Sequence, residues 1–216
     1  MAAAHRCTTT DMTTLPFQLP LIAILRGITP SEVDAHVDAL VEEGFDAIEI
    51  PTNSPGWLES VQRSVQRYGQ HACIGAGTVV QPAHIDGLLQ AGGRLMVTPN
   101  TDPQLIQRAV AEGLLVAAGF ATASEAFQAL RAGAQMLKLF PASIHGPALV
   151  RALRSVLPPV PLFAVGGVSP DTLASYLSAG CVGAGIGGDL YQPGQAVQTT
   201  REHARRFRQA YLDHSA

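Results

Sequence analysis

Residues Ala134–Pro141 have the sequence AQMLKLFP, a short apolar run that ends in a proline and carries one lysine, Lys138. Alanine-rich helical patterns flank the run on both sides. A short apolar run between two helices predicts a buried parallel strand. Pro141 marks where the chain leaves the sheet, because proline has no N–H to donate to a strand ladder.

Alternation along this strand decides what surrounds the lysine. Leu137 and Leu139 share one face, and Met136, Lys138 and Phe140 share the other. If the sheet closes into a barrel, one of these two faces is the barrel interior.

A lysine on an interior face has a chemical consequence. Loss of hydration favours the neutral amine and lowers the pKa of the lysine. A neutral amine is the nucleophile that attacks a carbonyl group to give a Schiff base. The alternative is a lysine whose stem lies along the strand while its ammonium group reaches water at the rim. The strand alone leaves both interpretations of Lys138 open.

The same unit of strand and helix recurs from Leu19 onward, at a spacing of roughly 20 to 25 residues. The predicted strands are Leu21–Arg26, Ala47–Pro51, Cys73–Thr78, Leu95–Pro99, Leu115–Gly119, Met136–Phe140, Leu162–Val165 and Val182–Gly187. Helical patterns follow them, with start signals such as Thr29–Glu32, Asp102-Pro103 and Ser169-Pro170. Several of these helices end on a glycine, at Gly44, Gly92, Gly113, Gly133 and Gly180.

Eight such units predict a single-domain (β/α)8 TIM barrel of the α/β class over residues 19–216, preceded by a disordered extension over residues 1–18. An open doubly wound sheet is the alternative, but the even length of the units favours closure.

Composition excludes several classes of protein. The chain has 216 residues, of which 47% are hydrophobic and 14% charged, which suits one domain with a large core. No apolar run approaches the roughly 18 residues of a membrane span. The formal charge of −3 gives no support to nucleic-acid binding. The three cysteines, Cys7, Cys73 and Cys181, are far apart and odd in number, which indicates a reducing compartment, the cytoplasm, and no metal site.

In a barrel of this kind the chemistry lies at the C-terminal ends of the strands. Glu49 stands among the apolar residues of the second strand, where a carboxylate is costly unless it is paired or functional. Its alternative role is a structural ion pair with Arg26 or Lys138. Arg26, which ends the first strand, either grips a substrate carboxylate or neutralises Glu49. Thr78 follows glycines that let a ligand approach and is either a hydroxyl donor or a helix cap.

Glycine pairs follow the last two strands, at Gly166-Gly167 and Gly187-Gly188. These are the positions at which a (β/α)8 barrel binds phosphate, on backbone N–H groups and a helix N-terminus. One glycine pair alone marks a tight turn as often as a ligand site. Two of them on neighbouring strands favour a phosphate site.

The histidines and the known short motifs add only negative evidence. None of the seven histidines forms a close pair with a carboxylate at metal-ligand spacing. The chain has no Walker loop, no Gly-x-Ser-x-Gly motif and no dinucleotide fingerprint after the first strand. No metal and no cofactor are therefore expected.

Motifs on six strands, in order, resemble those of the pyruvate-forming 2-keto-3-deoxy sugar-acid aldolases, the KDPG/KHG class I aldolases. The motifs are Leu19–Gly27, Glu49–Pro51, Gly75–Thr78, Thr98–Asn100, Lys138–Pro141 and Phe163–Val168, and the resemblance extends from Leu19 nearly to the C-terminus. It implies a (β/α)8 barrel that assembles as a homotrimer, uses no metal and acts on a small phosphorylated keto sugar acid. It also implies that Lys138 forms the Schiff base and that Glu49 is the acid/base.

The same resemblance assigns the rest of the site. Arg26 and Thr78 are expected to line the pyruvate half of the pocket. Pro99, Phe140 and Val165 complete the expected substrate-binding residues. The phosphate is expected on Gly166, Gly167, Gly187 and Gly188.

Details of two motifs are most similar to the galactonate branch of the family. These are Glu49–Asn53 and Ala164–Gly167, in which Val165 stands where the gluconate branch has a threonine. The implied reaction is cleavage of a 2-keto-3-deoxy-6-phosphohexonate to pyruvate and glyceraldehyde 3-phosphate. Two positions depart from the pattern: Gly188 replaces a serine that often holds the phosphate, and Ala118 replaces a proline.

Three other functions remain as alternatives at this point. A metal-dependent phosphosugar epimerase shares the barrel but needs histidines and acids on its strands. A phosphate-binding barrel without activity leaves Lys138 and Glu49 buried without purpose. An aldolase for the gluconate epimer or for 4-hydroxy-2-oxoglutarate uses the same lysine.

Overall fold

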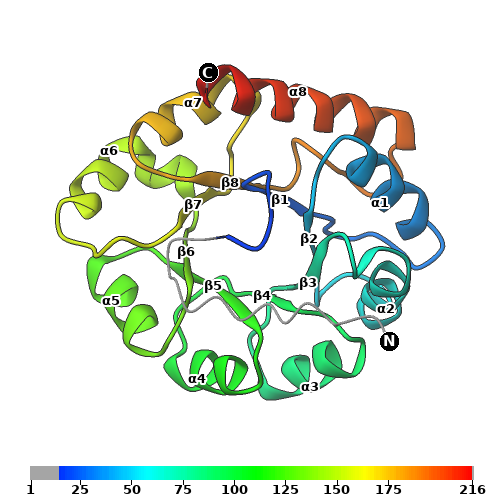
Figure 1. Ribbon diagram of the computed structural model, residues 1–216, viewed down its shortest axis with the longest axis horizontal. Helices are drawn as coiled ribbons and strands as arrows, with labels where there is room; N and C mark the ends of the chain where they lie inside the picture. The colour runs from blue at the N-terminus through cyan, green and yellow to red at the C-terminus, as the bar shows by residue number, and fades with distance from the viewer. Residues whose placement is uncertain (1–14, 216) are drawn as a thin grey trace.

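The computed structural model describes residues 15–215. In this part of the chain eight parallel strands alternate with eight helices, and the first strand lies beside the last (Figure 1). The strands are β1 Leu21–Ile24, β2 Ala47–Pro51, β3 Cys73–Gly77, β4 Leu95–Val97, β5 Leu115–Phe120, β6 Met136–Leu139, β7 Leu162–Val165 and β8 Gly183–Ile186. Register pairs from Leu21↔Ala184 to Ala23↔Ile186 join β1 to β8 and close the barrel. The predicted (β/α)8 barrel is confirmed, and the open sheet is excluded.

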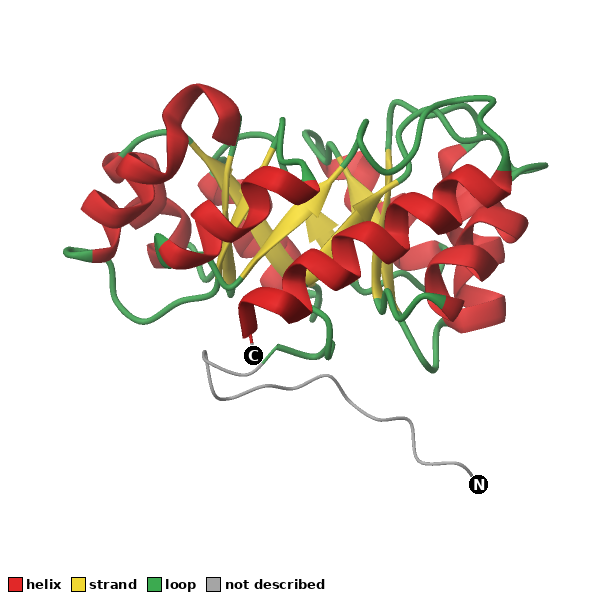
Figure 2. Cartoon of the chain, turned by 90° about the horizontal axis from the view of Figure 1, so that it is seen from above, coloured by secondary structure: helices red, strands yellow, loops and turns green. Residues whose placement is uncertain are grey.

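The helices surround the barrel on its outside (Figure 2). They are α1 Val33–Glu42, α2 Trp57–Tyr68, α3 Pro82–Gln90, α4 Pro103–Ala111, α5 Ala123–Arg131, α6 Ala142–Arg154, α7 Pro170–Ser178 and α8 Val197–Ser215. Thr122 and Ser169 each begin a helix with a capping box, and the Asp102 side chain accepts hydrogen bonds from two N–H groups of the first turn of α4. None of the described helices is long and apolar enough to cross a membrane.

The start of α1 differs from the prediction. Residues 29–32 form a turn, and the helix begins at Val33. The Glu32 carboxylate accepts hydrogen bonds from the N–H and the hydroxyl of Thr29, at 3.2 and 2.6 Å, so the acid closes this turn before the helix begins.

Several strands are shorter at their C-terminal ends than predicted. β1 ends at Ile24, β4 at Val97 and β8 at Ile186, so Arg26, Pro99 and Gly187 lie in the loops beyond them. The residues beyond these strands are thereby placed over the barrel mouth rather than in its wall.

Two apolar clusters separate the inside of the barrel from its outside. Leu137 and Leu139 belong to the large cluster between strands and helices. Met136 belongs to the smaller cluster that fills the barrel, together with Ile22, Ile24, Ala47, Cys73, Leu95, Val97, Leu115, Ala117, Phe163 and Val165. Because Lys138 is two residues from Met136 on a strand, the lysine also faces the interior.

The packed domain includes residues that precede the predicted boundary at Leu19. Phe17 is 5% exposed and joins the interior cluster, with its ring centroid 6.1 Å from that of Phe163. The N–H groups of Gln18 and Leu19 donate to the carboxylate of Asp46, at 2.6 and 3.3 Å. Phe17 therefore closes the N-terminal end of the barrel. The expected disorder of residues 1–14 lies outside the described residues.

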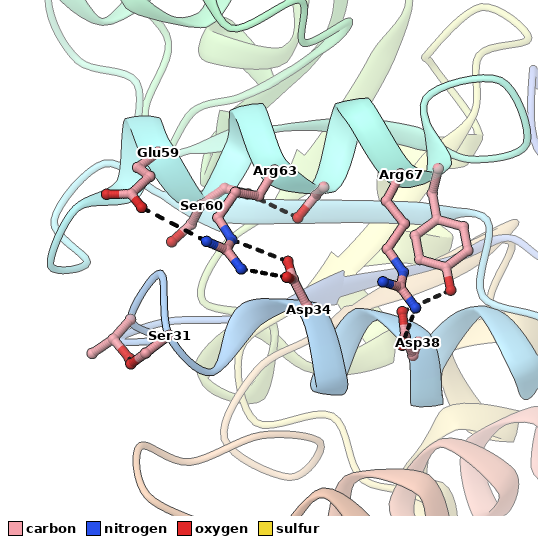
Figure 3. Close-up of polar contacts among 10 residues, drawn as sticks. Ser31, Asp34, Asp38, Glu59, Ser60, Arg63 and Arg67 are labelled. Carbon is pink, nitrogen blue, oxygen red and sulfur yellow. Dashed lines mark hydrogen bonds and ion pairs between the residues drawn. The ribbon is translucent and has the colours of Figure 1, made fainter.

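Ion pairs join the first two helices on the outside of the barrel (Figure 3). Arg63 of α2 pairs with Asp34 of α1, and Arg67 pairs with Asp38 one turn further along both helices, at 2.6 Å. Exposed pairs of this kind contribute about 0–1 kcal/mol each. They join neighbouring turns of α1 and α2 on the surface of the barrel.

Candidate active site

Lys138 lies near the C-terminal end of β6, in the barrel interior, and is 6% exposed. Its ammonium nitrogen is 4.9 Å from the ring centroid of Phe140, the next residue on the same face. Burial lowers the pKa of Lys138 to about 8, Glu49 opposes this shift, and the charge of Arg26 adds to it. At pH 7 roughly one amine in ten is then neutral, about two hundred times more than for an exposed lysine.

Lys138 is also the only lysine of the chain; the other 13 of the 14 cationic Lys and Arg residues are arginines. An arginine stays protonated at any ordinary pH and is a poor nucleophile. The single side-chain amine of the protein is therefore the buried one. This signal can be read from the sequence alone.

Glu49 lies on β2 and is 1% exposed. Burial raises its pKa to about 7, while the charges of Lys138 and Arg26 act in the opposite direction. Within residues 15–215 the Glu49 carboxylate makes no ion pair closer than 4 Å, and its Oε2 atom has no hydrogen-bond partner. The geometry thus contains a buried carboxyl group that titrates near neutral pH and is not held in a structural ion pair.

Gly77 of β3 makes the space that Glu49 occupies. A Cβ atom at position 77 would lie 1.9 Å from Oε2 and 2.2 Å from Cδ of Glu49. Gly75 is needed for a similar reason, because its Cβ would lie 1.8 Å from the carbonyl oxygen of Leu95. Both glycines are thus needed for close approach within the fold, of a neighbouring strand at Gly75 and of the Glu49 carboxylate at Gly77.

Arg26 is exposed at the rim and is held by its neighbours. Its Nη1 donates to Oδ1 of Asn53 at 2.7 Å, and its guanidinium approaches the hydroxyl of Thr78 at 3.4 and 3.5 Å. Thr78 has a φ of +56°, a strained value for a threonine, and its carbonyl oxygen accepts a hydrogen bond from the Thr52 hydroxyl at 2.7 Å. Strain of this kind clusters at functional sites.

The interpretation of Thr78 as a helix cap is wrong, because Gln81 is the N-cap of α3. Residues that the sequence analysis did not assign to the site are Asn53, which orients Arg26, and Ser54, whose hydroxyl accepts from the N–H of Gly27 at 2.9 Å. Both belong to the polar run directly after β2, which was a usable signal.

The three remaining substrate-binding candidates lie around the same mouth. Pro99 is half-buried, and its backbone approaches β5 so closely that position 119 must be a glycine. Phe140 is half-buried between Lys138 and the turn after β7. Val165 is 5% exposed and belongs to the interior cluster.

The two glycine turns differ in conformation. Gly166 and Gly167 have φ values of +95° and +72°, which glycine adopts readily. Gly187 and Gly188 have ordinary φ values, and a Cβ at either would meet nothing within 4 Å. None of the four N–H groups donates a hydrogen bond to another described part of the chain. Unpaired N–H groups on two adjacent turns offer an anion several donors.

Metal ligands do not gather in the described part of the chain. No group of three or more His, Cys, Asp or Glu side chains there is arranged to hold a metal ion.

Comparison with known proteins identifies the family to which this barrel belongs. The family model described as "KDPG and KHG aldolase" matches residues 15–204. The chain belongs to the KDPG and KHG aldolases. It is 54% identical over 197 residues to the 2-dehydro-3-deoxy-6-phosphogalactonate aldolase of Escherichia coli K12, covering 91% of this chain and 96% of that one.

Solved structures agree with this aldolase membership. "Native KDPGal structure" superposes with a TM-score of 0.92 at 52% identity, covering 93% of this chain and 98% of that one. A porous cage "designed by fusing symmetric oligomeric domains" superposes with a TM-score of 0.91 at 53% identity, covering 92% of this chain and 74% of that one. The family resemblance seen in the sequence motifs is confirmed, and the protein is an aldolase, a carbon–carbon lyase.

The close approach of Gly77 to Glu49 in this aldolase leads to a prediction. Gly77→Ala adds a methyl group where the carboxylate lies, so the carboxylate must move away. Overpacking of this kind costs about 1–3 kcal/mol of unfolding free energy, and we expect the cleavage rate to fall with it. Urea unfolding and a cleavage assay measure the two effects.

Gly188→Ala is the control for stability, because its added methyl group meets nothing within 4 Å. A Gly77→Ala variant that unfolds at the same urea concentration as wild type and keeps full turnover would show that Glu49 is not confined by β3.

Proposed function

We propose that this aldolase cleaves 2-keto-3-deoxy-6-phosphogalactonate to pyruvate and D-glyceraldehyde 3-phosphate through a Schiff base on Lys138. The observation that carries the proposal is the only lysine of the chain, buried in the barrel with its pKa lowered, in the same interior as a carboxyl group whose pKa is raised. The name of the E. coli relative supports the choice of substrate.

The first step uses the neutral amine of Lys138. The amine attacks the C2 ketone to give a carbinolamine, which loses water to give a protonated imine. The positive nitrogen accepts the electron pair of the C3–C4 bond as that bond breaks, and an enamine results. Protonation of the enamine at C3 and addition of water release pyruvate and restore the free lysine.

Glu49 is the proton carrier of this sequence. A carboxyl group with a pKa of about 7 is present in both protonation states near neutral pH. As the acid it protonates the carbinolamine hydroxyl, which leaves as water. As the base it takes the proton of the C4 hydroxyl when the C3–C4 bond breaks, which gives the aldehyde. Its lack of an ion pair leaves the carboxylate available for these steps.

The C1 carboxylate and the C6 phosphate of the substrate bind on opposite sides of the barrel opening. Arg26, oriented by Asn53, carries the positive charge that suits the C1 carboxylate, and Thr78 lies beside it. The unpaired N–H groups of the two glycine turns suit the phosphate at C6. Pro99 and Phe140 cover the carbon chain between these ends.

Imine trapping tests the lysine. Sodium borohydride with pyruvate should inactivate the enzyme and leave a carboxyethyl group on the peptide that contains Lys138, found by mass spectrometry. Because the chain has no second lysine, the only competing amine is the N-terminus. Lys138→Arg should show neither adduct nor turnover. An adduct elsewhere, or active Lys138→Arg enzyme, would remove the Schiff base from the proposal.

The preference for one C4 epimer has a separate origin. The galactonate and gluconate substrates share the keto acid and the phosphate, so Lys138 and the glycine turns cannot distinguish them. Val165, at the end of β7 in the interior cluster, is our candidate for the side chain beside C4, and its methyl group would lie 2.9 Å from a Cβ at Gly185. A valine offers the C4 hydroxyl no hydrogen bond.

We therefore expect faster cleavage of the galactonate epimer, with weaker activity on the gluconate epimer. Val165→Thr is nearly isosteric and adds a hydroxyl group, so it should shift the rate ratio toward gluconate several-fold, about 1 kcal/mol. The measurement is kcat/KM on both epimers.

Val165→Ala is the matched control, because it opens space without adding a hydroxyl group. If Val165→Thr and Val165→Ala change the ratio alike, shape and not hydrogen bonding sets the preference. If neither changes it, Val165 does not discriminate the epimers.

Other substrates of the family are a second candidate for this enzyme. Its description covers aldolases for the gluconate epimer and for 4-hydroxy-2-oxoglutarate, which use the same carbonyl chemistry. The rates on both epimers and on 4-hydroxy-2-oxoglutarate decide between these substrates.

Assembly and location complete the proposal. The expected homotrimer agrees with the description of the similar cage as a fusion of symmetric oligomeric domains, which favours a symmetric assembly. It is also supported by exposed apolar side chains such as Ile144 and Val156, which are 77% and 59% exposed. Sedimentation equilibrium measures the number of subunits. The odd number of widely spaced cysteines favours the cytoplasm.

A further inference from the structure

The first turn of α6 brings a hydroxyl group to the glycine turn after β7. Ser143 is the second residue of α6, and its N–H donates to the carbonyl oxygen of Gly166 at 3.0 Å. A Cβ atom at Gly167 would lie 2.7 Å from both Oγ and Cβ of Ser143. The serine side chain therefore lies directly against the Gly166-Gly167 turn.

The hydroxyl group of Ser143 has no task in the fold. The side chain is exposed, and its Oγ makes no hydrogen bond within the part of the chain that the structure describes. By contrast, the hydroxyl groups of Thr122 and Ser169 accept hydrogen bonds from the first turns of their helices. The N-cap of α6 is Pro141, so Ser143 is not needed as a cap.

The glycine turn after β8 supplies no side-chain hydroxyl group. Gly187 and Gly188 bring N–H groups and empty space, with no atom within 4 Å of a Cβ at either position. A phosphate dianion at this end of the mouth has three oxygens that accept hydrogen bonds. Two turns of glycine provide backbone donors but no side-chain donor.

We propose that Ser143 is a phosphate-binding residue, whose hydroxyl donates a hydrogen bond to the C6 phosphate beside the N–H of Gly167. The proposal rests on the proposed function, which places the phosphate at the glycine turns. Ser143 supplies from α6 the hydroxyl donor that the β8 turn lacks. It contributes to binding and not to the bond-breaking step, because Lys138 acts at the opposite end of the substrate.

Steady-state kinetics of Ser143→Ala test this assignment. A hydrogen bond to a charged group at a partly exposed site suggests a loss of about tenfold. We expect KM for the 6-phosphorylated substrate to rise by that factor, with kcat nearly unchanged. The kcat/KM for the same keto acid without phosphate should not change. Ser155→Ala at the C-cap of α6 is the control, since that hydroxyl donates to the carbonyl oxygen of Ala152.

A second variant tests the position of the missing donor. Gly188→Ser adds a hydroxyl group where the structure has open space and an ordinary φ value. In the Ser143→Ala background it should restore part of the lost affinity for the phosphorylated substrate only. Rescue of this kind is not expected if Ser143 merely supports the fold of α6.

Two results would overturn the assignment of Ser143. One is an unchanged KM for the phosphorylated substrate in Ser143→Ala. The other is an equal loss of kcat/KM with and without the phosphate. Failure of the proposed function appears differently, since wild-type enzyme would then neither cleave either epimer nor form the pyruvate adduct at Lys138.

Discussion

The desolvation of Lys138 and Glu49 within one barrel interior is the constraint on which the chemistry of this aldolase depends. Burial disfavours the charged form of each group, so the pKa of the amine falls to about 8 and that of the carboxyl group rises to about 7. Their mutual attraction opposes both shifts but leaves them in place. Two groups that are fully charged in water thereby approach the range in which each can gain or lose a proton during turnover.

The surrounding barrel excludes water from Lys138 and Glu49 and holds both groups in one interior. Gly77 gives the Glu49 carboxylate its space, and Phe17 closes the far end of the interior. Arg26 stays at the exposed rim, where Asn53 holds it, so its charge acts on the interior without forming an ion pair there. Rigid strands thus hold the reacting pair, while loops at the mouth hold the groups that suit the charged ends of a substrate.

Much of this architecture is predictable from the sequence because it depends on periodicity and on residue type. Eight repeated units predict closure, and strand alternation places Lys138 inside. The boundary at Leu19 was less predictable, because only the closed barrel shows that Phe17 fills its lower end. The true reason for Gly77 and the partner of Arg26 were also missed. The polar run after β2 marks Asn53 as a residue of interest, but its pairing with Arg26 and the approach of Glu49 to Gly77 join residues about 27 positions apart, which no local pattern contains.

The pKa of Lys138 is the measurement that tests the account most directly. Because the chain has only one lysine, protein labelled with lysine carrying 13C at Cε gives a single side-chain resonance that can be titrated by NMR. We expect a midpoint near pH 8, and a lower one in Glu49→Gln, because the Glu49 charge raises the pKa of the lysine. A midpoint near the ordinary lysine value of about 10.4, unaffected by Glu49→Gln, would contradict it.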